Sequence, residues 1–167
     1  MHIMTVCLGN ICRSPAAESV LVRKLEEAGL TDVTVSSAGT ANYHVGERAY
    51  DLTILEGEHR GYVFTTVGQQ FVAGHFAEAD LILAMDGSNV RNILRLAKNP
   101  EDRAKVVRMG AFAAETTGGI LDVPDPWGYP RHAFVEMYDQ LEDAVDGLIQ
   151  AIKDGTVDEI VARHAEG

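Results

Sequence analysis

Cysteine is scarce in this chain of 167 residues, which contains only Cys7 and Cys12. Two cysteines do not make the disulfide framework of a small secreted domain, and their separation lacks the paired spacing of a structural zinc site. Histidine offers no alternative metal site. Five histidines have no other ligand at metal-binding spacing and are expected on the surface: His44, His59, His75, His132 and His164. We therefore expect no metal and no cofactor.

Long apolar runs and positive charge are also in short supply. No stretch approaches the ~18 apolar residues of a membrane-spanning helix, and a strand begins almost at residue 1, which leaves no room for a secretory signal. The 14 lysines and arginines are outnumbered by 25 acidic residues, for a net charge of −11. Such a surface repels nucleic acid and anionic membranes. We expect a cytoplasmic protein with neither as a partner; the sequence does not fix the oligomeric state, and a monomer is the favoured interpretation.

Strand-like and helix-like segments alternate along the chain, which predicts an α/β fold. We expect a single domain over residues 1–167, with a central parallel four-stranded sheet, helices on both faces and residues 154–167 as a C-terminal extension or helix end. The predicted strands cover residues 2–7, 33–37, 79–85 and 104–108, and the predicted helices cover residues 15–28, 46–55, 88–96 and 131–153.

The last predicted helix carries the strongest periodic signal. Its apolar residues recur at alternating spacings of four and three: Phe134, Tyr138, Leu141, Val145, Leu148 and Ile152. This spacing predicts a buried face. The acidic pairs at 26–27 and 142–143 lie off the apolar faces of their helices, so we expect them to be solvated.

The first predicted strand runs directly into a Cys-x5-Arg segment, from Cys7 to Arg13. A loop of this length between a strand and a helix can turn successive backbone N–H groups towards one centre, which is how proteins bind phosphate. Gly9 and Asn10 are residue types that tolerate a positive φ. Ser14 and the proline after it read as a helix N-cap and first helical residue. We predict a phosphate-binding loop after the first strand.

The two ends of this loop carry the expected chemistry. A cysteine at a helix N-terminus beside a guanidinium loses its proton readily, and the thiolate of Cys7 would be a nucleophile. Arg13 offers a planar fork of donors that can hold two phosphate oxygens at once. A buried structural Cys7 beside a surface Arg13 is the alternative. Cys12 lies in the same loop, where its thiol could capture an oxidised Cys7 as a disulfide, and a small buried side chain is its other interpretation.

The segment Val-Cys-x-Gly-Asn-Ile-Cys-Arg-Ser-Pro at residues 6–15 resembles the signature of the low-molecular-weight protein tyrosine phosphatases. Further matching segments follow in that family's order and cover nearly the whole chain: residues 36–40, 43–46, 80–86 and 125–127. The resemblance implies hydrolysis of phosphotyrosine in protein substrates through a phosphocysteine intermediate.

Residue roles follow from the resemblance. It implies that Cys7 attacks, that Arg13 and the loop bind phosphate, that Ser14 steadies the thiolate, and that Asp125 moves the protons. The phosphate-binding residues would be Leu8, Gly9, Asn10, Ile11, Cys12, Arg13 and Ser14. Without the resemblance, Asp125 between prolines would read as an ordinary turn residue.

Substrate selection is expected from the walls beside the loop. By resemblance, Tyr43 and Trp127 flank the phenyl ring of phosphotyrosine, and core packing is the alternative for both. Ile11 would shape the same wall through its volume. Two departures from the family pattern stand out: Gly128 replaces a second aromatic residue, and residues 66–70 lack a histidine that helps to hold Asn10.

Three other functions remain open at this point. Gly128 suggests a protein arginine phosphatase, although the bulk of Ile11 argues against it. Arsenate reductase is also built on Cys-x5-Arg, but no cysteine follows Cys12, so only a form that uses an external thiol would fit. A catalytically silent phosphate-binding module is the third, and it is disfavoured because nucleophile, guanidinium and acid are all present.

Overall fold

The computed structural model describes residues 1–165, and the end of the predicted extension, 166–167, lies outside them. Its centre is a parallel sheet of four strands in the order β2-β1-β3-β4. The strands are β1 (His2–Cys7), β2 (Thr34–Gly39), β3 (Leu81–Ala84) and β4 (Val106–Arg108). Val6 near the end of β1 pairs with Ala38 on one side and Ala84 on the other. The predicted sheet is confirmed.

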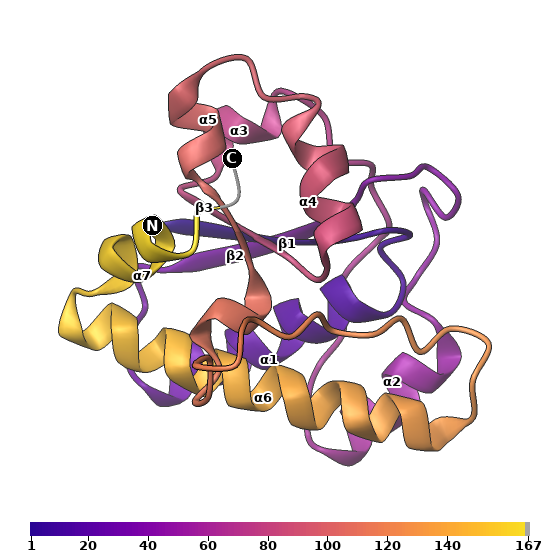
Figure 1. The fold of residues 1–167 in the computed structure, drawn as a ribbon. Coiled ribbons are helices and arrows are strands. Elements are labelled where there is room, and N and C mark those ends of the chain that lie inside the picture. The colour runs from indigo at the N-terminus through magenta and orange to yellow at the C-terminus, as the bar shows by residue number, and fades with distance from the viewer. Residues whose placement is uncertain (166–167) are drawn as a thin grey trace.

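Helices cover both faces of this sheet, as Figure 1 shows, with α1 and α6 below it and α3, α4 and α5 above it. The helices are α1 (Arg13–Glu27), α2 (Asp51–His59), α3 (His75–Glu78), α4 (Gly87–Leu94), α5 (Pro100–Ala104), α6 (Arg131–Asp154) and α7 (Val157–Arg163), with a 3-10 turn η1 (Met109–Phe112). Among residues 1–165, no helix is long and apolar enough to cross a membrane.

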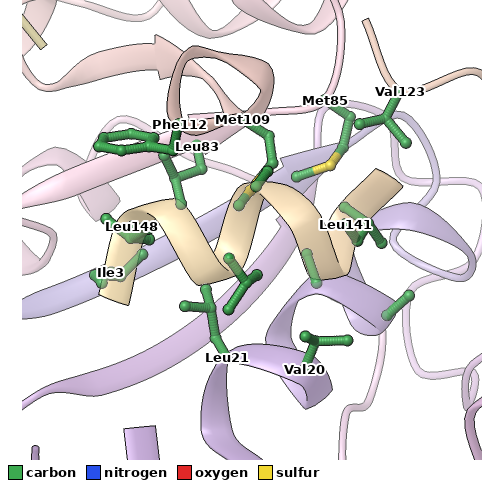
Figure 2. Packing of buried hydrophobic residues seen from close by; sticks show 14 of the residues in the cluster. Ile3, Val20, Leu21, Leu83, Met85, Met109, Phe112, Val123, Leu141 and Leu148 are labelled. Atoms are coloured by element: carbon green, nitrogen blue, oxygen red, sulfur yellow. The ribbon is translucent and has the colours of Figure 1, made fainter. Parts of the chain in front are cut away.

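Side chains alternate across the sheet and form two separate cores. Ile3 of β1 joins the larger core against α1 and α6, whereas Met4 and Val6 join the core beneath α3 and α4. Figure 2 shows Leu141 and Leu148 of α6 inside the larger core. The predicted apolar face of α6 is buried at every position except Ile152, which is partly exposed. This packing fixes the carboxyl end of β1 relative to α1 and α6.

The sequence prediction missed four short elements, which are α3, α5, η1 and α7, and it misplaced several boundaries. α2 begins at Asp51, five residues later than expected, because the chain turns at Gly46 with φ +85°. α5 was missed although Asn99 caps it by accepting a hydrogen bond from Asp102 N and Pro100 is its first residue. The predicted extension contains α7, whose Val157 is buried in the larger core.

Candidate active site

The predicted phosphate loop, residues 7–14, lies at the carboxyl end of the sheet between β1 and α1. It forms the floor of a cleft of about 270 Å³. The cleft brings together most of the predicted site residues: Cys7, Leu8, Gly9, Ile11, Arg13, Tyr43, Asp125 and Trp127, together with His44. Residues far apart in sequence thus meet around the sulfur of Cys7.

The loop is curled by Asn10, which adopts a left-handed φ of 56°. Its side-chain nitrogen, Nδ2, donates to Ser14 Oγ at 2.8 Å and to Ser37 Oγ at 3.0 Å. Gly39 at the end of β2 makes room for the curl, because a Cβ there would lie 2.7 Å from the carbonyl oxygen of Leu8. Both side-chain bonding and space therefore favour this loop conformation.

Gln69 lies in the segment 66–70, where the family histidine is lacking. Its backbone N–H donates to Asn10 Oδ1 at 3.0 Å, and its side-chain amide donates to the carbonyl of Ser37 at 2.9 Å. Thr66 instead donates to Glu18 at 2.9 Å. Gln69 thus bonds both Asn10 and Ser37.

Two carbonyls of the loop accept hydrogen bonds from other segments of the chain. Leu8 O accepts from Ala41 N at 2.9 Å, and Ile11 O accepts from Tyr50 N at 2.9 Å. Because the peptide unit is planar and trans, the N–H that follows each of these carbonyls points the opposite way, towards the cleft. Such converging amides favour an oxyanion.

Ser14 does not cap α1 as predicted, because the helix already begins at Arg13. Its hydroxyl lies 3.1 Å from Cys7 Sγ and 3.3 Å from the carbonyl of Ala38, while it accepts from Asn10. The hydroxyl is occupied by these partners and faces the sulfur instead of the helix end. Its single proton can go either to the carbonyl of Ala38 or to the sulfur, and an ionised Cys7 would be the stronger acceptor.

Arg13 is buried at 2% exposure, which rules out the surface arginine considered above. Its NH1 donates to Asp86 Oδ2 at 2.6 Å and to the carbonyl of Val123 at 3.0 Å. Its Nε has no hydrogen-bond partner among the described residues, and NH2 lies 3.8 Å from Asp125 Oδ2. A buried guanidinium Nε without a hydrogen-bond partner is well suited to bind an anion.

Charge balance keeps this guanidinium protonated. Burial lowers the pKa of Arg13, but the charge of Cys7, the hydrogen bond to Asp86 and the charge of Asp125 raise it by more, so the pKa lies above its usual value. For Cys12, burial is the largest cause and raises the pKa of the thiol to about 12. Cys12 is therefore a protonated, buried neighbour of the site.

Asp86 is a site residue that the sequence analysis missed. Its Oδ2 accepts from Arg13, and its Oδ1 accepts from Asn89 N at 2.7 Å as the N-cap of α4. The available signal was an aspartate between a buried strand and a predicted helix, which is typical of an N-cap. Nothing local indicated its second partner.

Asp125 and Trp127 lie in the segment 124–130 before α6, which we call the acid loop. Asp125 accepts a hydrogen bond from Trp127 N at 3.2 Å. Trp127 and Tyr43 are 56% and 68% exposed, so core packing is wrong for both and their rings are free to line the cleft. His44 lines it too, paired with Glu47 at 2.9 Å.

No group of three His, Cys, Asp or Glu side chains suited to a metal occurs in the described part of the chain.

The α/β fold and this cleft are those expected of a phosphatase, and the comparisons with known proteins identify the family. The chain belongs to the low molecular weight phosphotyrosine protein phosphatase family, whose model matches residues 2–157. It is 39% identical to the low molecular weight protein-tyrosine-phosphatase of Streptomyces coelicolor, over 92% of this chain and 94% of that protein. The Schizosaccharomyces pombe phosphatase is 36% identical, over 91% of this chain and 97% of its own length.

Solved structures show the same fold. A protein tyrosine phosphatase from Entamoeba histolytica has a TM-score of 0.87 and 35% identity, covering 94% of this chain and 99% of that one. Wzb of Vibrio vulnificus in complex with benzylphosphonate has a TM-score of 0.77 and 30% identity, covering 89% and 97%. The protein is thus a phosphomonoester hydrolase, and neither the arsenate reductase nor the arginine phosphatase alternative is favoured.

Proposed function

We propose that Cys7 is the nucleophile of this phosphatase. Its thiolate attacks phosphorus, an S–P bond forms, and the P–O bond to the leaving oxygen breaks. Asp125 gives its proton to that oxygen, while Arg13 and the loop amides of residues 8–13 hold the other phosphate oxygens. The observation that carries this proposal is one cleft that contains Cys7, Asp125 and a buried Arg13, whose Nε has no hydrogen-bond partner among the described residues.

The second step would hydrolyse the phosphocysteine. Asp125, now ionised, takes a proton from water, the water oxygen attacks phosphorus, and the thiolate of Cys7 leaves. The hydroxyl of Ser14, 3.1 Å from the sulfur, would donate to this departing thiolate. No metal or cofactor enters either step.

Phosphotyrosine in proteins is the proposed substrate. The exposed rings of Tyr43 and Trp127 offer two walls for a phenyl ring, and stacking of this kind is worth roughly 0.5–1.5 kcal/mol beyond burial. Ile11, on the floor of the cleft, adds an apolar contact. The benzylphosphonate held by Wzb supports an aromatic phosphate ligand here.

We further propose that residues 1–167 form one phosphatase domain that acts as a cytoplasmic monomer. The support for a cytoplasmic location is chemical: Cys7 and Cys12 are free thiols, and the reducing cytosol keeps thiols from forming disulfides. The net charge of −11 argues against nucleic acid and anionic membranes as partners. Cys12 is the proposed protecting thiol of Cys7.

A side-by-side rate comparison in EDTA tests the substrate. The phosphotyrosine peptide should be hydrolysed much faster than the peptides that carry phosphoserine or phosphoarginine. Ile11→Thr should gain relative activity on phosphoarginine by roughly some tens of fold, since methyl-sized discrimination is worth about 1–3 kcal/mol. Faster cleavage of phosphoarginine by the wild type would overturn the proposal in favour of a protein arginine phosphatase.

A further inference from the structure

The acid loop is anchored at its carboxyl end by a charged contact with α2. Arg131 directly follows the loop as the first residue of α6. Its Nε and NH2 both donate to Glu56 Oε1, each at 3.1 Å. Two donors from one planar fork fix direction as well as distance. The start of α6 is therefore held against α2.

Glu56 is itself rigidly placed. It is only 4% exposed, and its Oε2 accepts from Arg60 Nε at 2.7 Å. Burial raises the pKa of Glu56, but the hydrogen bonds from Arg60 and Arg131 lower it by more, so its pKa lies below the usual value. Arg60 in turn donates to Asp139 and Glu142 of α6. The carboxylate is thus ionised and held from two sides.

Helix α2 also contacts the phosphate loop, through the residue that precedes it. Tyr50, which precedes α2, donates from its N–H to Ile11 O at 2.9 Å. Its ring lies 6.5 Å from the ring of Trp127 and 5.9 Å from that of Phe134, centroid to centroid. One end of α2 therefore contacts the nucleophile's loop, and Glu56 near its other end holds the acid loop.

We propose that Glu56 is a positioning residue for proton transfer, acting through Arg131 on the placement of Asp125. The inference rests on the proposed role of Asp125 as the acid. Near the amino end of the acid loop, Val123 N donates to Met85 O at 2.8 Å, so the segment that carries Asp125 is fixed on both sides. Loss of the Glu56 contact would release the carboxyl end and move the acid away from the leaving oxygen.

The test is the leaving-group dependence of kcat/KM in Glu56→Gln and Arg131→Met. A misplacement of ~1 Å can cost about 100-fold in rate, and only a poor leaving group needs the proton. We expect about a tenfold loss on a phosphotyrosine peptide and less than about a twofold loss on dinitrophenyl phosphate. Equal losses on the two substrates in both variants would overturn the inference.

Two matched controls separate positioning from stability. Glu142→Gln removes a carboxylate from Arg60 but leaves the Arg131 contact intact. Glu58→Gln alters an exposed glutamate on α2, the helix that carries Glu56. Glu142→Gln should lower the Tm, as Glu56→Gln does, without a leaving-group-selective loss, and Glu58→Gln should change neither quantity. A selective loss in Glu142→Gln would contradict the inference.

An Asp125→Asn background separates this inference from the proposed function. Glu56→Gln added to Asp125→Asn should give no further selective loss, because both changes remove the same proton transfer. If Asp125→Asn alone shows no selective loss, the proposed role of Asp125 fails. If Asp125→Asn shows it while Glu56→Gln and Arg131→Met do not, only the positioning role of Glu56 fails.

Discussion

Asp86 holds Arg13 by a hydrogen bond of 2.6 Å between Oδ2 and NH1, while its other oxygen caps α4. The contact leaves the opposite edge of the guanidinium, with the unpaired Nε, for the ligand. One carboxylate therefore links the amino end of α4 to the phosphate-binding arginine.

Asp86→Asn should weaken phosphate binding while leaving the fold intact. Asparagine is as good an N-cap as aspartate, so α4 keeps its cap, but the charged bond to Arg13 is lost. Hydrogen bonds to charged groups are worth about 1.5–3 kcal/mol, which predicts at least a tenfold rise in the Kd of phosphate, measured by calorimetry. Asp86→Ala should in addition lower the Tm. An unchanged Kd in Asp86→Asn would contradict the positioning of Arg13 by Asp86.

Asp125→Asn should slow the enzyme in proportion to how poor the leaving group is. General acid catalysis contributes roughly 100- to 10,000-fold, and an activated aryl phosphate needs little of it. The loss of kcat/KM on phosphotyrosine should therefore greatly exceed the loss on dinitrophenyl phosphate. The alkaline limb of the pH profile should also flatten, because no catalytic proton remains to be lost. Equal losses with an unchanged profile would make Asp125 a turn residue.

Cys12→Ser should make peroxide damage permanent. Burial raises the pKa of Cys12 to about 12, so this thiol stays protonated at neutral pH. A protonated thiol reacts poorly with peroxide itself. Once Cys7 is a sulfenic acid, the Cys12 sulfur can attack the Cys7 sulfur as the S–O bond breaks, and the thiol proton leaves with the hydroxyl as water, which forms a disulfide. Dithiothreitol should restore the wild type but not the variant, in which mass spectrometry should find sulfinic or sulfonic acid at Cys7. Equal recovery in both proteins would reject Cys12 as the protecting thiol.

Because of Glu56, the free energy of unfolding should depend on pH in the acid range. Its pKa is lower in the folded protein than the ~4.3 of an unfolded chain, so the ionised carboxylate stabilises the fold above that pH. This stability is lost as pH falls through the folded-state pKa. Urea unfolding at neutral pH should find Glu56→Gln about 1.5–3 kcal/mol less stable than the wild type, and the difference should shrink at acid pH. A difference that is constant with pH would refute this.

The phosphate loop was predictable because its information is local. Cys7 and Arg13 are six positions apart, the strand before them and the helix after them are visible as patterns, and the fold then follows from alternation. The roles of these residues remain proposals, whereas their meeting in one cleft with Asp125 is observed.

The supports of the loop could not be predicted, because they come from distant segments. Asp86 lies 73 positions from Arg13, and Gln69 lies 59 positions from Asn10. The two acidic pairs are solvated as predicted at Glu26, Glu27 and Asp143. Glu142 is only partly exposed, because its carboxylate accepts from Arg60 and from the hydroxyl of Tyr62. Periodicity identifies the face of a helix but not the partner that a neighbouring helix brings to its edge.

The nucleophile can be tested directly by measuring turnover and phosphate binding in the same Cys7→Ser protein. The loop amides and Arg13 survive this change, so calorimetry should find phosphate bound within a few-fold of the wild-type affinity. Turnover of phosphotyrosine peptide should fall below detection, a loss well beyond the roughly 100- to 1,000-fold that removal of a single transition-state hydrogen-bond donor costs. Turnover within about 100-fold of the wild type would contradict catalysis by Cys7.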